Sequence, residues 1–358
     1  MDVVIIGAGL SGLAAAAVLR EAGADVVLVE ADRQIGGRIR VHHEPGTNRA
    51  LADLGPTWVW PRYQPVVSKW IVTLGLETFD QFIEGDAVIQ GYAPTTLRQS
   101  LPSQDGIARV VGGPSAFIDA LAKRLDTAKV RTSTPVTGIF ESGSHGISVH
   151  LGSGEAITAS QVIISVPLRV AAASLDMPWA SSELVDAMRR TPTWMSSHAK
   201  AVALYEQPFW RMSGLSGRIA SRIGPLVEAH DHSGRDGVPA AIFGFVGWPP
   251  QVRRRDPDGL KRAILEQLSE CLGPAAAHPI NLVVQDWATH PYIVTDVDIS
   301  EPANHPDIAP FSLRQAHLDG RVRFAVSEAS EVSPGLIEGA LAAGERAGNK
   351  LIQIARNV

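Results

Sequence analysis

The first thirty residues place a strand, a glycine-rich turn and a helix in direct succession. Residues 3–6 are a short apolar run, typical of a parallel strand that is covered on both faces. The pattern Gly7-x-Gly9-x-x-Gly12 follows at once, and an alanine- and leucine-rich stretch over residues 10–22 then ends at Gly23. A second apolar run occupies residues 26–29. This order predicts a βαβ unit and, from it, a doubly wound α/β sheet.

Each glycine of the turn has its own task in binding a dinucleotide. Gly7 permits a tight turn, Gly9 lets the backbone approach a pyrophosphate, and Gly12 allows the helix to pack closely. The helix begins at Leu10 and Ser11, where unpaired N–H groups and the positive end of the helix dipole would meet the phosphates. The strand before the turn and the helix after it make this pattern informative.

Two features after the second apolar run extend the site. Glu30 stands 18 residues past Gly12 and, next to Ala31, suits a carboxylate that bonds the ribose hydroxyls. Gly36-Gly37 is a second glycine pair, followed by Arg38, which would bring a cation to the same pyrophosphate. A nicotinamide-binding fold does not usually need this second phosphate loop.

Composition excludes several classes of partner. A net charge of -5 argues against nucleic acid, whose partners usually carry a basic footprint. The one cysteine, Cys271, cannot form an intramolecular disulfide, so a cytoplasmic location is expected. "MDVVIIGAG" resembles a first strand and not a signal peptide, and the charged residues after Pro334 argue against a membrane span. Neither a metal-ligand spacing nor a G-x-S-x-G nucleophile motif is present.

The stretch "SSHAKAVALYEQPFW", residues 196–210, contains an expected strand with a lysine in it. Because side chains alternate across a strand, His198 and Lys200 share the face of Val202 and Leu204. Alternation alone favours a lysine whose stem lies on apolar surface while its ammonium reaches water. His198 is either a structural side chain, the commoner case, or a general base.

Five segments together resemble the flavin-containing amine oxidase family, the monoamine oxidase-like FAD enzymes. They are "GAGLSG" with "VEADRQIGGR", "DLGPTWVWP", "TPVTGI" with "VIISVP", "HAKAVALYEQPFW", and "FAVSEASEVSPGLIEGALAAGERAG". They occur in the family's order at comparable spacing and cover most of the chain. The resemblance implies a Rossmann-like (GR2-type) FAD-binding domain over residues 1–68, 106–190 and 288–358. A β-rich α+β substrate domain, residues 69–105 and 191–287, would interleave with it.

The resemblance also assigns residues to the cofactor. Those that would hold its ADP and ribityl parts are Gly7, Gly9, Leu10, Ser11, Gly12, Glu30, Ala31, Gly36, Gly37, Arg38, Val136 and Glu328. Those that would line the isoalloxazine ring are Gly55, Pro56, Thr57 and Trp58. Ile337 and Glu338 would begin a helix whose N-terminus stabilises negative charge at the pyrimidine end.

Lys200 is the catalytic residue that the resemblance implies. It stands ten residues before Trp210 of "QPFW", as does the family's lysine that bonds, through a water, to the flavin nitrogen that accepts hydride. Alternation alone favours a Lys200 whose ammonium reaches water, whereas this spacing favours a Lys200 that faces the flavin. The resemblance assigns no role to His198.

The chain departs from the family in ways that bear on cofactor and cavity. Residues 77–108 are short where larger members insert helices, which predicts a reduced and more open substrate domain. Val326 replaces a glycine of the C-terminal turn, so the backbone's approach to the cofactor is expected to change. No cysteine follows "DWATHPY", and Cys271 falls on the core side of a helix, so FAD is expected to bind noncovalently.

A further departure concerns the substrate. Many members frame the amine with two aromatic residues, which attract it to the ring. The matching positions here are Leu336 and either Asp296 or Val297, none of them aromatic. Trp58, Trp60, Tyr292 and Trp287 could line the cavity instead, although large aromatic residues are more often simply packed. The candidate substrate residues are thus Trp60, His198, Tyr292 and Leu336.

Three functions remain open at this point. The first is oxidation of a small amine or amino acid by hydride transfer to FAD, with dioxygen as acceptor, the imine hydrolysed and hydrogen peroxide released. The second is a flavin desaturase, dehydrogenase or isomerase of a nonamine substrate, which the lost aromatic pair favours. The third is a binding module in which FAD is structural. The resemblance favours the first, with no nucleic-acid or membrane partner, and a homodimer is left open.

Overall fold

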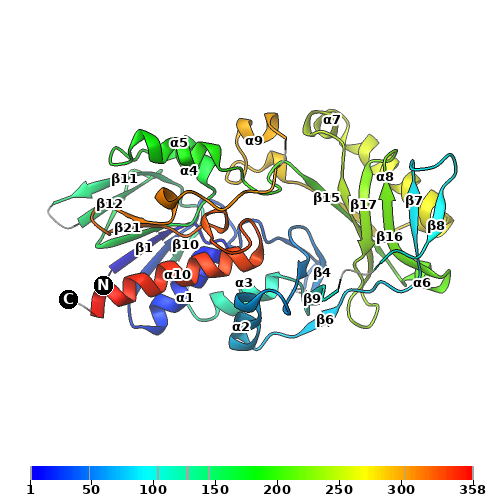
Figure 1. Ribbon diagram of the computed structural model, residues 1–358, viewed down its shortest axis with the longest axis horizontal. Coiled ribbons are helices and arrows are strands. Elements are labelled where there is room, and N and C mark those ends of the chain that lie inside the picture. Colours follow the sequence, from blue (N-terminus) through cyan, green and yellow to red (C-terminus); the bar gives the residue numbers. More distant parts are fainter. Residues whose placement is uncertain are drawn as a thin grey trace.

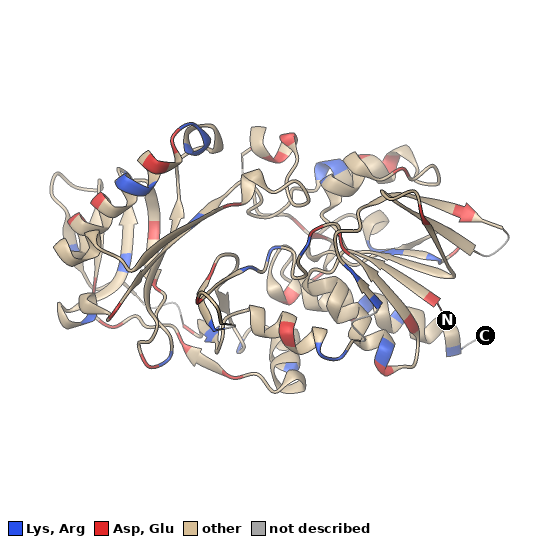
Figure 2. Ribbon diagram, turned by 180° about the vertical axis from the view of Figure 1, so that it is seen from behind, with Lys and Arg blue, Asp and Glu red and all other residues tan. Residues whose placement is uncertain are grey.

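The computed structural model describes residues 2–47, 49–102, 105–125, 129–143, 146–302 and 304–356. Two large sheets lie toward opposite ends of the long axis of the molecule, one near the N- and C-terminal labels and the other beside α8 (Figure 1). Figure 2 shows basic and acidic residues interspersed over both halves. Within the described ranges, none of the helices has the length and apolar character that crossing a membrane requires.

The first sheet has six strands, in the order β10-β2-β1-β14-β21-β20. Their bounds are β10 Val130–Arg131, β2 Asp25–Val29, β1 Asp2–Ile6, β14 Gln161–Ile164, β21 Val322–Phe324 and β20 Ala316–His317. All pairs are parallel except β20 with β21. The apolar runs of β1, β2 and β14 are buried on both faces, as parallel strands require. The doubly wound sheet predicted from residues 2–29 is confirmed.

Helices cover one face of this sheet, and a small sheet with two helices covers the other. The first layer consists of α1 (Leu10–Glu21), α3 (Ser115–Ala122) and α10 (Ile337–Arg356). The second consists of β11 (Val136–Ser142), β12 (Gly146–Leu151) and β13 (Ala156–Ala159), with α4 (Leu168–Ser174) and α5 (Ser182–Arg190). Helix α10 packs closely along α1, because a Cβ at Gly344 would lie 2.2 Å from the Ser11 carbonyl oxygen.

The second sheet has seven strands, in the order β19-β15-β18-β17-β16-β7-β8. Their bounds are β19 Asn281–Asp286, β15 Ala199–Tyr205, β18 Ala240–Val246, β17 Leu226–Asp231, β16 Leu215–Ser221, β7 Asp86–Gln90 and β8 Leu97–Gln99. One face packs on α8 (Pro257–Leu272), where Cys271 is buried as expected. The other face, with Val202 and Phe243, packs toward β4 (Ala50–Asp53). Both faces of β15 are therefore buried.

Short elements connect these parts. The strands are β3 Val41–His43, paired with β4, and the set β5 Trp58–Val59, β9 Ala108–Val110 and β6 Thr78–Asp80. The helices are α2 Pro65–Leu74, α6 Phe209–Met212, α7 Pro250–Arg255 and α9 Asp296–Ser300, and the 3₁₀ turns include η3 Trp287–Thr289 and η5 Ser327–Ala329. Helix α2 ends before Gly75, whose φ of 65° stops the helix in a left-handed turn.

Three elements end or begin at positions that bear on the site. Helix α8 begins at Pro257, because Asp256 caps it by accepting from the Gly259 N–H. Strand β14 ends at Ile164 and β21 at Phe324. Residues 327–329 form η5, which carries Glu328.

Candidate functional site

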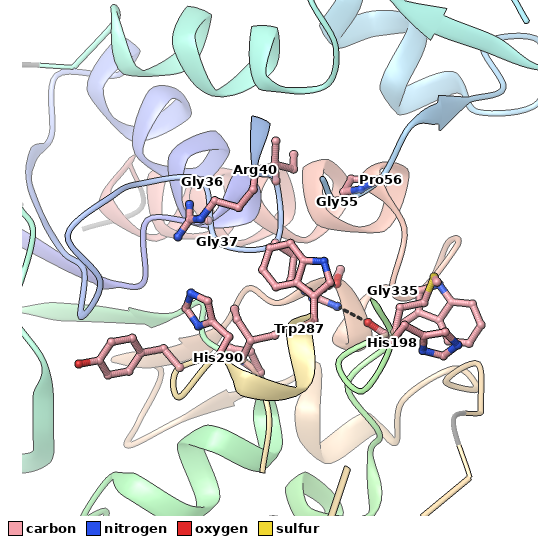
Figure 3. A pocket seen from close by; sticks show the side chains of 18 of the residues that line it. Gly36, Gly37, Arg40, Gly55, Pro56, His198, Trp287, His290 and Gly335 are labelled. Atoms are coloured by element: carbon pink, nitrogen blue, oxygen red, sulfur yellow. Dashed lines mark hydrogen bonds between the residues drawn. The ribbon is translucent and has the colours of Figure 1, made fainter. Parts of the chain in front are cut away.

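A cavity of about 890 Å³ extends from the glycine turn after β1 to strands β15, β17 and β18. Of the site residues expected from the sequence, all except Gly12, Glu328 and Glu338 line it. Figure 3 shows Gly36, Gly37 and His290 on one side of Trp287, and Gly55, Pro56 and His198 on the other. We call the part around the two glycine loops the nucleotide end, and the part around Lys200 the substrate end.

The two glycine loops touch each other at the nucleotide end. Gly36 N–H donates to the Ala8 carbonyl at 2.8 Å, and a Cβ on Gly37 would lie 3.2 Å from the Gly9 Cα. Gly7 has a φ of 99°, which only glycine adopts readily. A Cβ on Gly12 would lie 2.1 Å from the Gly7 carbonyl oxygen, so Gly12 supports the turn from behind. This wall of the cavity is main chain.

Glu30 fastens the first loop to the chain that leads into the second. Its Oε2 accepts from the Ala8 N–H at 2.8 Å, and its Oε1 accepts from the Asp32 N–H at 2.9 Å. Burial raises the pKa of this carboxyl, against the two hydrogen bonds, which lower it. Glu30 borders the cavity, and its contact with a ribose stays a prediction.

Arg38, which is half-buried, forms an ion pair with the buried Glu328 beside the second loop. The Arg38 guanidinium donates to both carboxylate oxygens of Glu328, at 2.6 Å and 3.0 Å. Burial alone would raise the pKa of Glu328, but the Arg38 charge holds it below its usual value. Glu328 therefore fixes Arg38, which lines the cavity, while Glu328 itself lies behind. The valine at 326 fits because its backbone is extended, with a φ of -114°.

Three residues that sequence reasoning missed gather at the nucleotide end. Asp32 accepts from Arg40 at 2.6 Å, and it lies 3.1 Å from the His290 Nε2. All three line the cavity, and Figure 3 shows Arg40 and His290 approaching the same region from different segments. The buried His290 Nδ1 has no hydrogen-bond partner among the described residues. Burial lowers the pKa of His290, while the neighbouring Asp32 raises it.

Lys200 lies at the substrate end, with its ammonium turned toward the loop after β4. Its Nζ donates to the Gly55 carbonyl at 3.0 Å and to the Thr57 hydroxyl, and it stands 4.4 Å from the Phe243 ring centroid. Lys200 is only 3% exposed, so the interpretation in which its ammonium reaches bulk water is wrong. Burial lowers its pKa to about 7, although the nearby Asp53 carboxyl raises it in part.

A buried polar cluster behind Lys200 was also missed. Asp53 N–H donates to the His232 Nε2 at 3.0 Å, and Arg109 donates to the Ser233 carbonyl. Burial raises the pKa of Asp53 and lowers that of His232 well below its usual value. These residues come from β4, β9 and the end of β17, and no local sequence pattern links them. The cluster adds charge beside Lys200 without contact with bulk solvent.

His198 borders the cavity just before β15. Its carbonyl accepts from the Trp287 N–H at 3.0 Å, the contact dashed in Figure 3, and its buried Nδ1 has no partner among the described residues. Burial, and then the Arg253 charge, lower the pKa of the imidazole. The contact shows a structural role for its backbone, and a base role for its ring stays a prediction.

Aromatic residues line the cavity at positions other than those of the family's aromatic pair. Trp58, Trp60, Trp287 and Tyr292 all border the cavity, as the sequence suggested. The Trp58 indole donates to Gln81, and that of Trp287 to the Leu54 carbonyl, so both rings are held in place. Asp296 and Val297 lie in α9 and are absent from the lining, whereas Leu336 borders it.

One acidic side chain, Glu228 of β17, lines the substrate end and was also missed. His230 lies 2.7 Å from it on the same strand and packs against Trp58. The hydrogen bond with His230 lowers the pKa of Glu228, so the carboxylate is ionised at neutral pH. Arg253, which also borders the cavity, is already paired with Asp286.

These residues fit a flavin dinucleotide. The glycine loops leave a main-chain cradle that side chains would fill, Arg38 and Arg40 supply cations, and α10 begins at Ile337 on the cavity wall. Glu338, in the first turn of α10, joins this helix to α2, because its carboxylate accepts from the N–H of Val67 in α2 at 2.6 Å. Over the described ranges, no group of three or more His, Cys, Asp or Glu residues is arranged to hold a metal ion.

Comparisons with known proteins agree with this geometry. A family model described as "Flavin containing amine oxidoreductase" matches residues 10–104 and 93–352. A probable flavin-containing monoamine oxidase A of Dictyostelium discoideum is 27% identical, over 68% of this chain and 53% of that protein. This chain thus spans about half the length of that relative. The putrescine oxidase of Kocuria rosea is 24% identical, over 98% of this chain and 95% of that protein.

Solved structures show the same fold. The cyclohexylamine oxidase from Brevibacterium oxydans superposes with a TM-score of 0.83 at 20% identity, over 99% of both chains. A putrescine oxidase bound to putrescine gives a TM-score of 0.81 at 21% identity, over 98% of this chain and 99% of that one. The predicted fold class is confirmed. The predicted domain boundaries and residue roles stay predictions.

Proposed function

Because this chain belongs to the flavin-containing amine oxidoreductase family, we propose that it is an FAD-dependent enzyme that oxidises small amines, with dioxygen as electron acceptor. The observation that best supports this proposal is the buried Lys200, which faces the cavity beside Gly55 and Thr57. FAD, when bound, accepts a hydride from the carbon next to the substrate nitrogen. The chain's own residues bind the cofactor, exclude water and position the amine.

Noncovalent binding of FAD is supported by the position of the only cysteine. Cys271 is buried in α8 and does not line the cavity. We therefore assign the cofactor's retention to the glycine loops, Glu30 and Arg38. The N-terminus of α10 would stabilise negative charge at the pyrimidine end of the ring.

Lys200 is proposed to hold and transfer a proton during reoxidation by dioxygen. A pKa near 7 lets Nζ carry or release a proton at neutral pH. The Gly55 carbonyl and the Thr57 hydroxyl fix the ammonium at the cavity wall. Both partners belong to the segment that the family resemblance places beside the flavin.

The charges at the substrate end favour an amine over an amino acid. Glu228 would attract a cation and repel a substrate carboxylate. Arg253, the cation on that wall, already has Asp286, Trp248 and Ser197 as partners. An α-carboxylate would thus compete with a formed ion pair for its binding group.

Two measurements test the proposal. The purified protein is expected to be yellow, and acid is expected to release its FAD. Anaerobic mixing with primary, secondary and aromatic amines is then expected to bleach the flavin, with peroxide formed on admission of air. If no amine bleaches the flavin, amine oxidation is contradicted.

A second candidate function follows from Leu336, which stands where many members have an aromatic residue. A dehydrogenase or desaturase of a nonamine substrate would not need that aromatic frame. It would show flavin reduction by a nonamine and no peroxide in air. A cytoplasmic location and a homodimer are proposals from the sequence alone, which cell fractionation and light scattering would test.

A further inference from the structure

His198 lies near the start of helix α10, where the family resemblance places the pyrimidine end of the flavin. Its ring centroid is 6.3 Å from that of Trp194. Trp194 in turn packs on Gly335, where a Cβ would lie 2.7 Å from the Trp194 Cβ, and Gly335 stands two residues before α10 begins. All three line the cavity, and Figure 3 shows His198 and Gly335 on the same side of Trp287. The imidazole therefore shares a cavity wall with the positive end of the α10 dipole.

The fold fixes the position of this ring. The His198 N–H donates to the Met195 carbonyl at 3.1 Å, and the His198 carbonyl accepts from the Trp287 N–H at 3.0 Å. Met195 has a φ of 56°, a left-handed value that few residues other than glycine adopt. The Arg253 guanidinium donates to the Ser197 carbonyl at 2.8 Å, so the residue before His198 is also held. Backbone strain that neighbouring contacts maintain in this way is typical of functional sites.

Neither ring nitrogen of His198 has a partner in the described part of the chain. Nδ1 is buried without a hydrogen bond, and no hydrogen bond to Nε2 is found there. A neutral imidazole carries one proton, so one nitrogen keeps a free lone pair whichever tautomer is present. The ring can therefore accept a second proton without breaking an existing hydrogen bond.

The charges of the chain itself keep this ring neutral. Burial, and then the positive Arg253, lower the pKa of His198. The acids nearby are already paired, Asp286 with Arg253 and Glu328 with Arg38. A negative charge placed in the cavity would act in the opposite direction and raise the pKa of the ring. The titratable groups on the elements around it are Lys200 of β15, Arg253 of α7, Asp286 of β19, Glu228 of β17, Glu328 of η5 with Arg38, and His305 against Trp194.

We propose that His198 takes up a proton from solvent when the bound FAD is reduced, and thereby stabilises the reduced state of the cofactor. The inference rests on the FAD site of the proposed function and is independent of which substrate supplies the electrons. Reduction by a hydride gives the flavin two electrons and one proton, which leaves one negative charge on its ring system. A second proton, released by water or a buffer acid, binds the free nitrogen of His198 and balances that charge.

Lys200 is another group in the cavity that titrates near neutral pH, because burial lowers its pKa to about 7. Its Nζ is already bonded to the Gly55 carbonyl and the Thr57 hydroxyl, whose oxygens favour the protonated amine in both states of the cofactor. His198 has no comparable bond, so its charge depends more on what occupies the cavity. The experiment therefore varies both residues.

The reduction potential of the bound flavin reports this proton. A tenfold change in proton concentration shifts a two-electron couple by about 30 mV for each proton taken up. The midpoint potential of the holoenzyme is measured anaerobically against redox dyes from about pH 5.5 to 9, a range that spans the ordinary pKa of histidine. The variants are His198→Gln and Lys200→Met. His278→Gln is the matched control, because His278 is an exposed histidine outside the cavity.

Wild type and His278→Gln are expected to show a slope of about 60 mV per pH unit, for two protons, between the pKa values of His198 in the oxidised and the reduced enzyme. Outside that window the slope is expected to be about 30 mV, for one proton. His198→Gln is expected to give the one-proton slope throughout. Its potential should lie below that of wild type at low pH and meet it at high pH, because the stabilising proton is lost as pH rises through the pKa of the reduced enzyme.

A one-proton slope in wild type at every pH overturns the inference. So does a steeper slope that persists in His198→Gln and disappears in Lys200→Met, because the proton then belongs to Lys200. Should His198→Gln fail to retain FAD, a pH indicator measures the protons taken up on reduction in wild type and in Lys200→Met near neutral pH. Two protons per flavin in both would support His198, and a single proton in Lys200→Met would overturn its role.

The choice of reductant separates this inference from the proposed function. Dithionite reduces the bound flavin whether or not an amine is a substrate. A second proton at His198, without bleaching by any amine, would support the inference and contradict amine oxidation. Bleaching by amines together with a one-proton slope would support amine oxidation and overturn the role of His198.

Discussion

The two ends of the cavity are built from different materials. At the nucleotide end the wall is main chain, held where Gly7, Gly9 and Gly37 leave no side chain. At the substrate end the wall consists of side chains that project from sheet strands, among them Lys200 and Glu228. A methyl group added to the main-chain wall takes space that the cofactor needs, whereas a side-chain wall can be altered one group at a time. Substitutions of the loop glycines should therefore abolish binding at the first end, and substitutions at the second should change rate or selectivity.

The largest expected effect is the loss of FAD on adding a methyl group to the glycine turn. In Gly9→Ala the nearest atom to the new Cβ is 3.9 Å away, so the free protein should fold while the methyl occupies space needed by the pyrophosphate. In Gly12→Ala the Cβ meets the Gly7 carbonyl oxygen, so stability should also fall, by about 1 to 3 kcal/mol. FAD titration and thermal unfolding of the FAD-free proteins measure the two effects. Retention of FAD by both variants would contradict a main-chain cradle.

Next in size is the effect of Lys200→Met on reoxidation. Reaction of the reduced enzyme with dioxygen should slow by about 100-fold, the lower range for a positioned proton donor. Anaerobic reduction by amine should change by only a few-fold. Stopped-flow absorbance measures both steps, and Lys261→Met, an exposed lysine on α8, is the control. Unchanged reoxidation in Lys200→Met would remove the proposed role.

The pH dependence gives a smaller and sharper test. Burial lowers the pKa of Lys200 to about 7, so the protonated form is lost as pH rises through that value, and reoxidation should slow with it. Asp53 raises the pKa of Lys200, so Asp53→Asn should move the midpoint of the profile to lower pH. A profile that is flat in wild type, or that moves to higher pH in Asp53→Asn, would contradict this coupling.

The smallest effect concerns a side chain at the nucleotide end. His290 borders the cavity beside Arg40, and its Nδ1 has no partner among the described residues. If it contacts a phosphate, His290→Ala should weaken FAD binding by about 3- to 10-fold, as the loss of one modest hydrogen bond does. The exposed His278→Ala is the control, and FAD titration the measurement. Equal FAD affinity in His290→Ala and His278→Ala would contradict a contact between His290 and the phosphates.

The sequence predicted well where a short segment carries its own geometry. The turn from β1 to α1 depends on the glycine spacing and the apolar strand before it, so the residue pattern alone was enough to place Gly7, Gly9 and Glu30. The direction of the Lys200 side chain could be predicted only with the family resemblance, because side-chain alternation alone predicts that its ammonium reaches water.

Sequence reasoning missed residues that are neighbours only through the tertiary fold. Asp53, Arg109 and His232 lie far apart in the chain and meet because β4, β9 and the end of β17 converge behind Lys200. Glu228 faces the cavity because the pairing of β17 with β18 shifts register between Leu226 and Glu228. Regular alternation along β17 would have placed only one of Val227 and Glu228 on the cavity wall, whereas both line it. Long-range contact and strand irregularity leave no periodic signal in a single sequence.

The pairing of early with late segments has a consequence for biosynthesis. Strand β14 pairs with β21, Arg38 pairs with Glu328, and α1 packs on α10. A ribosome releases Glu328 and α10, the partners of Arg38 and α1, only after some three hundred residues of chain have been made. Until then the nascent protein exposes one edge of β14 and an apolar flank of α1, surfaces that chaperones recognise. The cofactor site is therefore completed only near the end of synthesis, and FAD binds after that point.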